Sequence, residues 1–288
     1  ISKGKSAQFP LMGVATAKYH TVGQLIEADA IKHAERTVTV DDLLISTQFI
    51  SNIDEAMNHY DVRSVYSKEA GFALSNTADK NIAKIIATAA GINNATESAS
   101  YFGASFADEV YTDNITIGSS AGDALLGDKI VAAIYDALEE FDKKDITGDK
   151  VCVLPPAQYY SLLNVSSTTG ATWLNTQVGG SGSVSQGTVP MVGGVKIMMS
   201  NHIPQTDESS TSLTPNPVTT SRANVYKGNF SSVRGLIFSQ DAAATVKLLD
   251  LGVESEYQID RQGTLMVAKY AMGHNVLRPA CAIQLLSA

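Results

Sequence analysis

Apolar residues recur at the spacing of one helix face between residues 52 and 91. Such spacing places side chains on the same side of an α-helix, so the pattern predicts a single long helix here. Asn52 is expected to cap its start, and Gly91 to follow its end with a positive φ. An unbroken helix over this range would be about 55–60 Å long, and Gly71 is its predicted bending point. The apolar positions are Ile53, Met57, Tyr60, Leu74, Ala78, Ile82, Ile85 and Ala89.

Two strand-like runs precede this helix. Residues 33–41 alternate apolar and polar positions and are rich in β-branched residues, which is typical of a β-strand. Residues 7–20 are expected to form the outgoing strand, and residues 23–31 a turn or short helix between the two. An isolated two-stranded ribbon is marginally stable in water and exposes sheet edges and apolar side chains. The pattern therefore predicts a long arm that needs a partner surface, for which a neighbouring subunit is the simplest supplier.

The later patterns predict a second helix, a series of strands and three loops. Residues 119–144 carry an apolar stripe at helical spacing, with Ser119 or Ser120 as the cap and two lysines at the end. The predicted loops or exposed insertions are residues 93–105, 168–188 and 204–222. The predicted strands are residues 151–154, 195–199, 236–238, 245–259, 265–272 and 280–286, and Pro155-Pro156 is expected to open a short helix. This order of elements predicts an α+β fold rather than a regular doubly wound sheet.

Composition narrows the classes of function. The net charge is −8, and the Lys and Arg residues are scattered along the 288-residue chain. A protein that grips DNA through its phosphates needs a clustered positive surface, so nucleic-acid binding is not expected as the primary activity. The sequence contains no run of 18 or more apolar residues, so no membrane span is expected. Cys152 and Cys281 lie in apolar strand-like runs and are expected to be buried, reduced thiols.

Two glycine-containing segments superficially resemble catalytic motifs. Residues 122–129 are similar to a phosphate-binding loop, but Asp128 stands where that loop needs lysine. Residues 179–183 approach the strand-to-helix turn that carries a nucleophilic serine, but the closing glycine is missing. A hydrolase that uses this Gly/Ser segment remains an alternative, although no base or oxyanion donor can be identified for it.

Isolated polar side chains offer no clear site either. His59 and Asp61 lie two positions apart on the predicted helix, so they point to different faces and cannot readily share a metal. Asp41 and Asp42 alternate at a strand end and are not expected to act as paired acids. His274 follows a glycine and is expected to be a hydrogen-bonded turn residue. The sequence thus predicts no catalytic, cofactor-binding or metal-binding residue, and the protein is not expected to be an enzyme.

Four segments carry a resemblance to a known family. They are residues 1–10 (ISKGKSAQFP), 54–64 (DEAMNHYDVRS), 244–248 (ATVKL) and 268–279 (AKYAMGHNVLRP). In their sequence and order they resemble the major capsid proteins of T-odd-type short-tailed bacteriophages, the autographivirus-like podoviruses, cyanophages included. The matches span nearly the whole chain, whereas residues 93–235 match weakly.

That resemblance implies the major capsid protein fold of tailed bacteriophages. Residues 1–50 would be the end of the N-terminal arm and the extended β-hairpin loop. Residues 51–103 and 240–288 would form the peripheral domain with a long spine helix, and residues 104–239 the axial domain. Further residues would precede Ile1 in the gene product. The long helix and the arm agree with this interpretation, as does the lack of an active site, whereas a fibre or adhesin would be expected to show repeats, which the sequence lacks.

The implied function is that of a structural subunit of an icosahedral virus capsid. The implied partners are copies of the chain itself in hexamers and pentamers, and a scaffolding protein and portal during assembly. Packaged double-stranded DNA would be contacted only non-specifically, and no membrane is involved. The protein would reside in the virion capsid after assembly in the cytoplasm of the bacterial host.

Charged residues on the arm and the long helix are the candidate contacts between subunits. The basic candidates on the arm are expected to pair with acidic residues on a neighbour's helix. The candidates are Lys3, Lys5, Lys18, Lys32 and Arg36 on the arm, and Asp54, Glu55, Asp61 and Glu69 on the helix.

Overall fold

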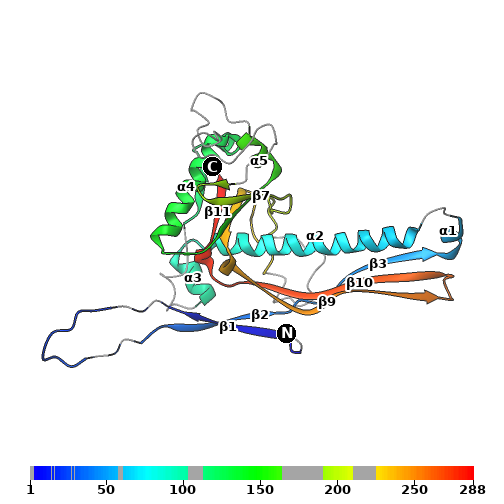
Figure 1. Ribbon diagram of the computed structural model, residues 1–288, viewed down its shortest axis with the longest axis horizontal. Helices are drawn as coiled ribbons and strands as arrows, with labels where there is room; N and C mark the ends of the chain where they lie inside the picture. Colours follow the sequence, from blue (N-terminus) through cyan, green and yellow to red (C-terminus); the bar gives the residue numbers. More distant parts are fainter. Residues whose placement is uncertain are drawn as a thin grey trace.

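A computed structural model describes residues 3–13, 15, 17–26, 28, 30–57, 61–102, 113–163, 191–209 and 225–288. The molecule is elongated, with a long helix lying along a three-stranded sheet (Figure 1). A six-stranded sheet with two helices stands above one end of that helix, and a β-hairpin extends beneath it. The mixture of segregated helices and mainly antiparallel strands is the predicted α+β fold.

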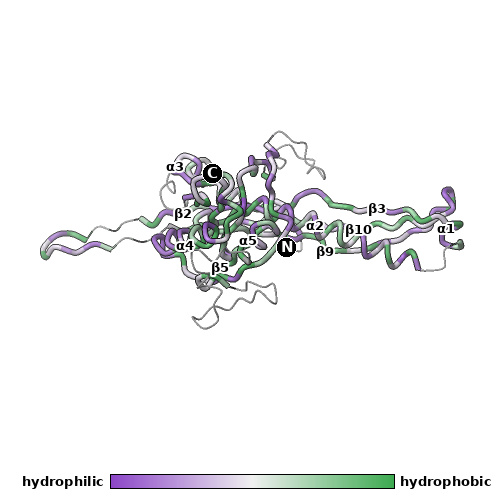
Figure 2. Tube along the Cα trace, turned by 90° about the horizontal axis from the view of Figure 1, so that it is seen from above, coloured by the Kyte–Doolittle hydropathy of each residue, from purple (hydrophilic) through white to green (hydrophobic). Residues whose placement is uncertain are grey.

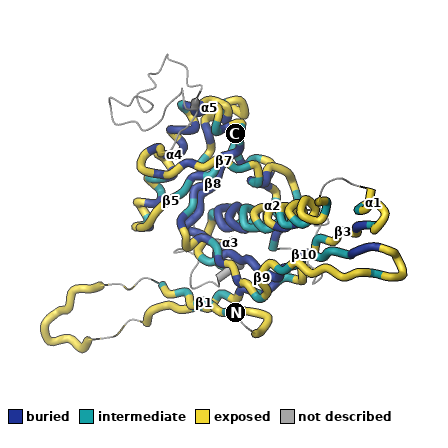
Figure 3. The backbone as a smooth tube through the Cα atoms, turned by 45° about the vertical axis from the view of Figure 1, so that its right-hand side comes forward, coloured by how far each residue is buried: buried dark blue, intermediate teal, exposed yellow. Residues whose placement is uncertain are grey.

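Helix α2 (Val62–Gly91) holds the two sheets together. Its 30 residues give it a length of about 45 Å. In its first half, Ala70 and Leu74 pack on Ala268 and Tyr270 of the three-stranded sheet. In its second half, residues from Ile85 to Ala90 enter the largest core cluster, together with the six-stranded sheet. In Figure 3 the dark blue, buried positions of α2 are concentrated where the helix enters that core.

The predicted single helix over residues 52–91 is divided into two. Helix α1 (Asn52–Met57) follows β3 directly, and α2 has its own N-cap, Asp61, whose carboxylate accepts a hydrogen bond from the Ser64 amide at 3.3 Å. Asn52 does not cap a long helix, because its side-chain amide donates to the Tyr257 hydroxyl at 2.8 Å across the sheet end. Gly91 is the last residue of α2 and does not adopt a positive φ. The end of β3 therefore fixes α1 at the tip of the molecule.

The three-stranded sheet has the antiparallel order β3-β10-β9. Strands β9 (Ala243–Gln258) and β10 (Gly263–Val276) cover two of the predicted runs. Strand β3 (Leu44–Ser51) was not predicted, and it pairs with β10 from Leu44 opposite Tyr270 to Ser51 opposite Gly263. Its polar residues hide the alternation that marks a strand, so only the pairing reveals it.

The six-stranded sheet has the order β4-β11-β8-β5-β7-β6. Its strands are β4 (Ile115–Ile117), β5 (Lys150–Leu154), β6 (Met191–Val192), β7 (Val195–Met199), β8 (Val233–Ser239) and β11 (Ala282–Ser287). Strand β11 comes from the C-terminal end of the chain and pairs with both β8 and β4. Cys152 and Cys281 are free and buried, as predicted.

Two helices pack beside this sheet. Helix α4 (Gly127–Lys143) buries the predicted stripe through Ile130, Ile134, Ala137 and Phe141, each fully inaccessible. The predicted start at residue 119 is a separate 3-10 helix, η2 (Ala121–Leu125), with Ser120 in a capping box with Asp123. Helix α5 (Pro156–Leu163) begins at the predicted proline pair. Two further short 3-10 turns, η6 (Gln240–Ala242) and η7 (Pro279–Cys281), lead into β9 and β11.

Two other expectations are corrected. Within the predicted loop 93–105, residues Ala95–Phe102 form helix α3, which Asn94 caps by accepting from the Glu97 amide at 2.9 Å. His274 lies inside β10 rather than in a turn, and its Nδ1 lies 2.9 Å from the Thr245 hydroxyl. His59, the predicted loop 168–188 and most of the predicted insertion 204–222 lie outside the described residues.

Candidate assembly surfaces

The predicted arm is a hairpin whose strands pack on their own chain. Strand β1 (Ser6–Met12) pairs antiparallel with β2 (His33–Thr39), with Met12 opposite His33 at the outer end. The outgoing strand is thus shorter than the predicted range 7–20. Along both strands one face turns inward, and Phe9 and Val38 join a cluster with Val246 and Ala271 of the three-stranded sheet. The strands are therefore not a free ribbon, contrary to the expected arm that depends wholly on a neighbour.

The described residues of the connecting segment 13–32 project beyond the body of the molecule (Figures 1 and 2). We call this segment the arm tip. It carries large apolar side chains in water, with Tyr19, Val22 and Leu25 at least 88% exposed and Ile26 at 78%. Exposed apolar side chains in such density on a projecting segment are typical of a surface that is covered in an assembly.

A second apolar surface lies at the opposite end, on the face of the three-stranded sheet turned away from α2. On β10, Ala268 and Tyr270 contact the helix, so the alternate residues Leu265 and Val267 face the other way. Their neighbours on β3 include Phe49, opposite Leu265, and Ile45, opposite Lys269. Ile45 is 53% and Phe49 43% exposed. We call these four apolar residues, Ile45, Phe49, Leu265 and Val267, the open sheet face.

The hairpin and the open sheet face share one sheet surface. Ala271, which packs under the hairpin, lies on the same face of β10 as Val267 and Leu265, further along the strand. One half of this surface is thus covered by the chain's own hairpin, and no other described element covers the distal half (Figure 1). A sheet face of this kind has room for a second ribbon from another molecule.

The five basic candidates lie along the hairpin. Lys3 and Lys5 are exposed at its inner end, and Lys18 and Lys32 are exposed on the arm tip. Arg36 is directed into its own chain instead: its Nε donates to the Val276 carbonyl and its Nη2 to Asn275 Oδ1, both at 3.2 Å. Its predicted pairing with a neighbour's helix stays a prediction, and its described bonds already give it a structural role.

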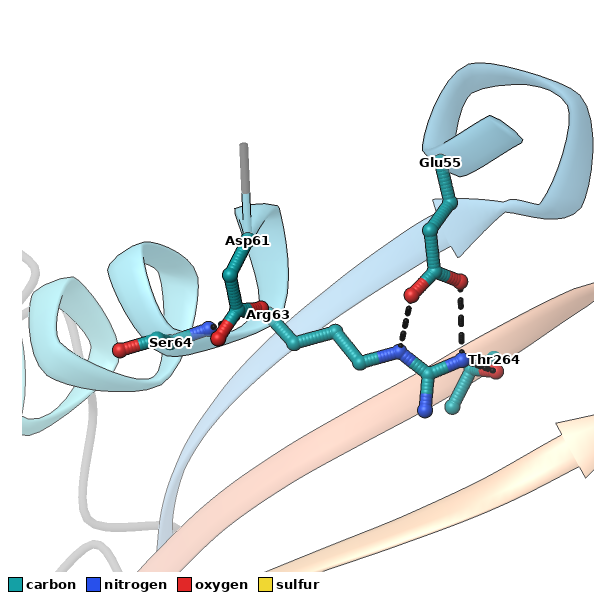
Figure 4. A network of polar contacts seen from close by, with 5 residues as sticks. All are labelled: Glu55, Asp61, Arg63, Ser64 and Thr264. Carbon is teal, nitrogen blue, oxygen red and sulfur yellow. Dashed lines mark hydrogen bonds and ion pairs between the residues drawn. The ribbon is translucent and has the colours of Figure 1, made fainter. Parts of the chain in front are cut away.

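The acidic candidates gather at the far end of the molecule, on α1 and the start of α2. Asp54 and Glu69 are exposed. Glu55 forms a two-pronged ion pair with Arg63, with Nε to Oε1 at 2.6 Å and Nη2 to Oε2 at 2.9 Å (Figure 4). The same Nη2 also donates to Thr264 of β10 at 3.3 Å. The hydrogen bonds to Glu55, followed by the negative charge of that residue, raise the pKa of the Arg63 guanidinium.

Basic arm tip and acidic helix end lie at opposite ends of one chain (Figures 1 and 2). Within a subunit Lys18 and Lys32 therefore do not meet Asp54 or Glu69, and any such pair must join two copies. Asp61 lies at the same end and serves as the α2 cap. The charged candidates could be selected from the sequence, whereas the exposed apolar residues, Leu25, Ile26, Ile45 and Phe49 among them, could not. Tertiary packing decides whether an apolar side chain is exposed. For Leu25 and Ile26 the sequence offers one indication, because apolar residues are unusual in a turn region.

Among the described residues, no group of three or more His, Cys, Asp or Glu side chains is arranged to hold a metal ion. In the same part of the chain, no helix has the length and apolarity that crossing a membrane requires.

Solved structures place this architecture in a known class. The chain matches the capsid structure of the cyanophage P-SCSP1u with a TM-score of 0.83 and 38% identity, covering 100% of this chain and 85% of that one. It also matches the mature capsid of bacteriophage PhiM1 with a TM-score of 0.72, covering 99% of this chain and 82% of that one, at 16% identity. The fold is therefore that of tailed-bacteriophage capsid proteins.

Sequence comparison gives the family. The family model described as Gp10A-like major capsid protein matches residues 8–286, and the chain belongs to this family. The chain is 30% identical to the major capsid protein of Escherichia phage T7, over 98% of this chain and 82% of that protein. It is 29% identical to the major capsid protein of Enterobacteria phage T3, with the same coverage. The protein is thus a structural subunit of a phage capsid and not an enzyme, which confirms the resemblance seen in the sequence.

Proposed function

We propose that each subunit lays its arm tip on the open sheet face of a neighbouring subunit, and that this contact repeats around hexamers and pentamers to close the shell. The observation that carries the proposal is the pairing of two exposed apolar surfaces at opposite ends of one elongated chain. A surface at one end that fits a different surface at the other makes a head-to-tail contact, and such contacts form rings when the rotation between successive copies closes.

The apolar residues supply the attraction in this contact. Fully burying one Leu, Ile or Phe side chain contributes about 1.5–3 kcal/mol, so a few of them outweigh the cost of docking the arm. The edges of the sheet add backbone hydrogen bonds where an extended segment pairs with them. An obligate contact of this type is expected to bury more than about 2,000 Å² in total.

The charged candidates orient the contact rather than hold it. Exposed ion pairs contribute only about 0–1 kcal/mol each, although a shell repeats them many times. We infer that Lys18 and Lys32 approach the acidic end of the neighbour, where Asp54 and Glu69 are exposed. We infer that Lys3 and Lys5, at the inner end of the hairpin, also pair with acidic residues of a neighbouring subunit.

The resemblance implies a peripheral domain of residues 51–103 and 240–288, an axial domain of residues 104–239, and an arm and extended loop of residues 1–50. We propose this division with two changed bounds, for which the strand pairing is the reason. Strand β3 pairs with β10, and β11 joins the six-stranded sheet. We therefore assign residues 44–51 to the peripheral part and residues 282–287 to the axial part.

The remaining partners follow from the proposed role. A scaffolding protein and the portal would guide assembly in the cytoplasm of the bacterial host, and the closed shell would enclose double-stranded DNA. The net charge of −8 supports non-specific contact with that DNA, since a negative protein surface does not adhere to phosphates.

Removing the arm tip tests the proposal. Gly13 and Lys32 form a hydrogen-bonded pair, with the Gly13 amide donating to the Lys32 carbonyl at 2.9 Å, so replacing residues 14–31 by Asn-Gly closes the hairpin with a two-residue turn and keeps both strands. We expect this variant to fold, with a cooperative thermal transition, and to form no shells in negative-stain electron microscopy with scaffolding protein. The full chain under the same conditions is the control. Closed shells from the shortened chain would contradict the proposed contact.

A further inference from the structure

Strand β10 approaches the root of the hairpin unusually closely at Gly273. A Cβ atom built on Gly273 would lie 2.0 Å from the Thr39 carbonyl oxygen and 2.8 Å from the Val40 Cα. Real Cβ atoms do not approach backbone this closely, so only glycine permits the contact. The backbone bond from the Asp41 amide to the Met272 carbonyl, at 3.0 Å, continues this approach.

The next residues of β10 hold the returning strand of the hairpin by side-chain bonds. Asn275 donates from Nδ2 to the Thr37 carbonyl at 3.0 Å and accepts from Arg36 Nη2 at 3.2 Å. Arg36 Nε reaches the Val276 carbonyl, also at 3.2 Å. The planar guanidinium makes both bonds at once, which fixes the strand in direction as well as in position.

A third contact comes from the segment that leads to the six-stranded sheet. Tyr226 is only 2% exposed, and its hydroxyl donates to the Asp41 carboxylate just beyond the end of β2. The hairpin root is therefore bound to both sheets, to β10 through Gly273 and Asn275 and to the six-stranded part through Tyr226.

We infer that these residues form an arm-root clamp, made of Arg36, Asp41, Tyr226, Gly273 and Asn275, which sets the direction in which the hairpin leaves the body. The inference deepens the proposed function, on which it rests, because an arm can reach a neighbour only if it leaves the body in a defined direction. The arm tip lies well away from the clamp, so a small rotation at the root displaces the tip much further. The clamp residues are thus positioning residues, and they need not touch the neighbour themselves.

The substitution Gly273→Ala tests the clamp, with Gly252→Ala as its matched control. Gly252 also lies within a strand of the same sheet, and a Cβ added there meets nothing within 4 Å. Spin labels on Met12→Cys and Ala132→Cys, both exposed positions, report the distance between the hairpin end and helix α4 in dissociated subunits. The two native cysteines are at most 1% exposed and so are protected from labelling.

We expect Gly273→Ala to shift or broaden the label-to-label distance while Gly252→Ala matches the unsubstituted chain. Equal distances in all three proteins would overturn the inference. Should Gly273→Ala fail to fold, Arg36→Lys decides, since lysine cannot make both bonds of the guanidinium. Its control is Arg234→Lys, which makes the same chemical change where Nη1 bonds the local carbonyls of Ser231 and Val233. A distance left unchanged by Arg36→Lys would also overturn the clamp.

Shell formation by the same variants is measured separately. We expect shells from Gly252→Ala and Arg234→Lys, and absent or irregular shells from Gly273→Ala and Arg36→Lys. Normal shells built from subunits with a displaced arm would contradict the proposed arm contact, while the label distances would still establish the clamp.

Discussion

Tyr270 illustrates how a single buried side chain links the spine helix to the sheet. It is 6% exposed, and its hydroxyl donates to the Leu74 carbonyl of α2 at 3.4 Å. Burial, followed by the negative charges of Asp41 and Asp79, raises the pKa of Tyr270 to about 12. An ordinary tyrosine titrates near pH 10, so the folded state holds this proton more tightly than the unfolded chain does.

The consequence is a loss of stability in alkaline solution. The contribution of Tyr270 is fully present below about pH 10 and is lost as the pH rises from about 10 to 12. Burial raises the pKa of the Cys152 thiol to about 12 as well, so we compare variants in a Cys152→Ala background. We expect the urea concentration at the unfolding midpoint of dissociated subunits to decrease as the pH is raised from 9.5 to about 11. The decrease should be less steep for Tyr270→Phe. An identical slope in both proteins would refute the assignment to Tyr270.

At the scale of elements, helix α1 depends on the tertiary structure for its existence. Six residues are too few for a stable isolated helix, because nucleation costs more than so few bonds return. The Arg63 guanidinium ties Glu55 of α1 to the start of α2 and to Thr264 of β10 (Figure 4). This charged contact therefore helps to order the end of the molecule that carries the acidic candidates, beside the bonds that Asn52 makes to Tyr257 and Gln262.

We expect Glu55→Gln to loosen α1 without unfolding the protein. The glutamine loses one charge-assisted bond of the two-pronged pair, so the amides of residues 52–57 should exchange hydrogen several-fold faster, while the thermal midpoint stays nearly unchanged. Asp54→Asn is the matched control, since it removes a carboxylate from the same helix and leaves the Arg63 pair intact. Equal exchange rates in the two variants would show that the pair does not hold α1.

At the scale of the whole molecule, two apolar surfaces at opposite ends favour association over isolation. The arm tip of one chain cannot reach the open sheet face of the same chain, because the hairpin and the sheet extend in opposite directions (Figure 1). Burial of both surfaces thus requires another molecule. In the proposed contact that molecule is a second copy, which itself has one surface left to bury against the next copy.

Polar substitution of the arm tip should therefore weaken assembly. We expect the double change Leu25→Ser and Ile26→Ser to raise the subunit concentration needed for shells by about tenfold or more, since about 1.4 kcal/mol corresponds to a factor of ten. Light scattering against concentration measures it. Leu125→Ser with Leu126→Ser alters a second adjacent pair of exposed apolar residues, 56% and 47% exposed, and is expected to have little effect. An equal effect from both pairs would mean that the arm tip has no special role.

The sequence located much of the candidate assembly surface. It could not show which kind of contact, charged or apolar, contributes more to that surface. The hairpin was predicted because residues 33–41 alternate, and four of its five basic candidates fall on exposed positions: Lys3, Lys5, Lys18 and Lys32. The bond of Arg36 to Asn275 could not be predicted, because the two residues lie 239 positions apart and no local pattern joins them. The apolar contacts were missed for a related reason: Phe49 and Val38 look alike in the sequence, and only packing buries one and exposes the other.

The sequence by itself determined the elements whose signal is local. The stripe of α4 and the alternation of β2 follow the period of their element, the long strands β9 and β10 fall on strand-like runs, and four segments in the family's order were enough to indicate the family. Tertiary structure alone decided which strands pair, that β3 joins β10, and that the long helix begins anew at Asp61. It also decided which apolar residues remain in water. These outcomes depend on contacts between residues far apart in the chain, which the spacing of neighbours along the sequence does not encode.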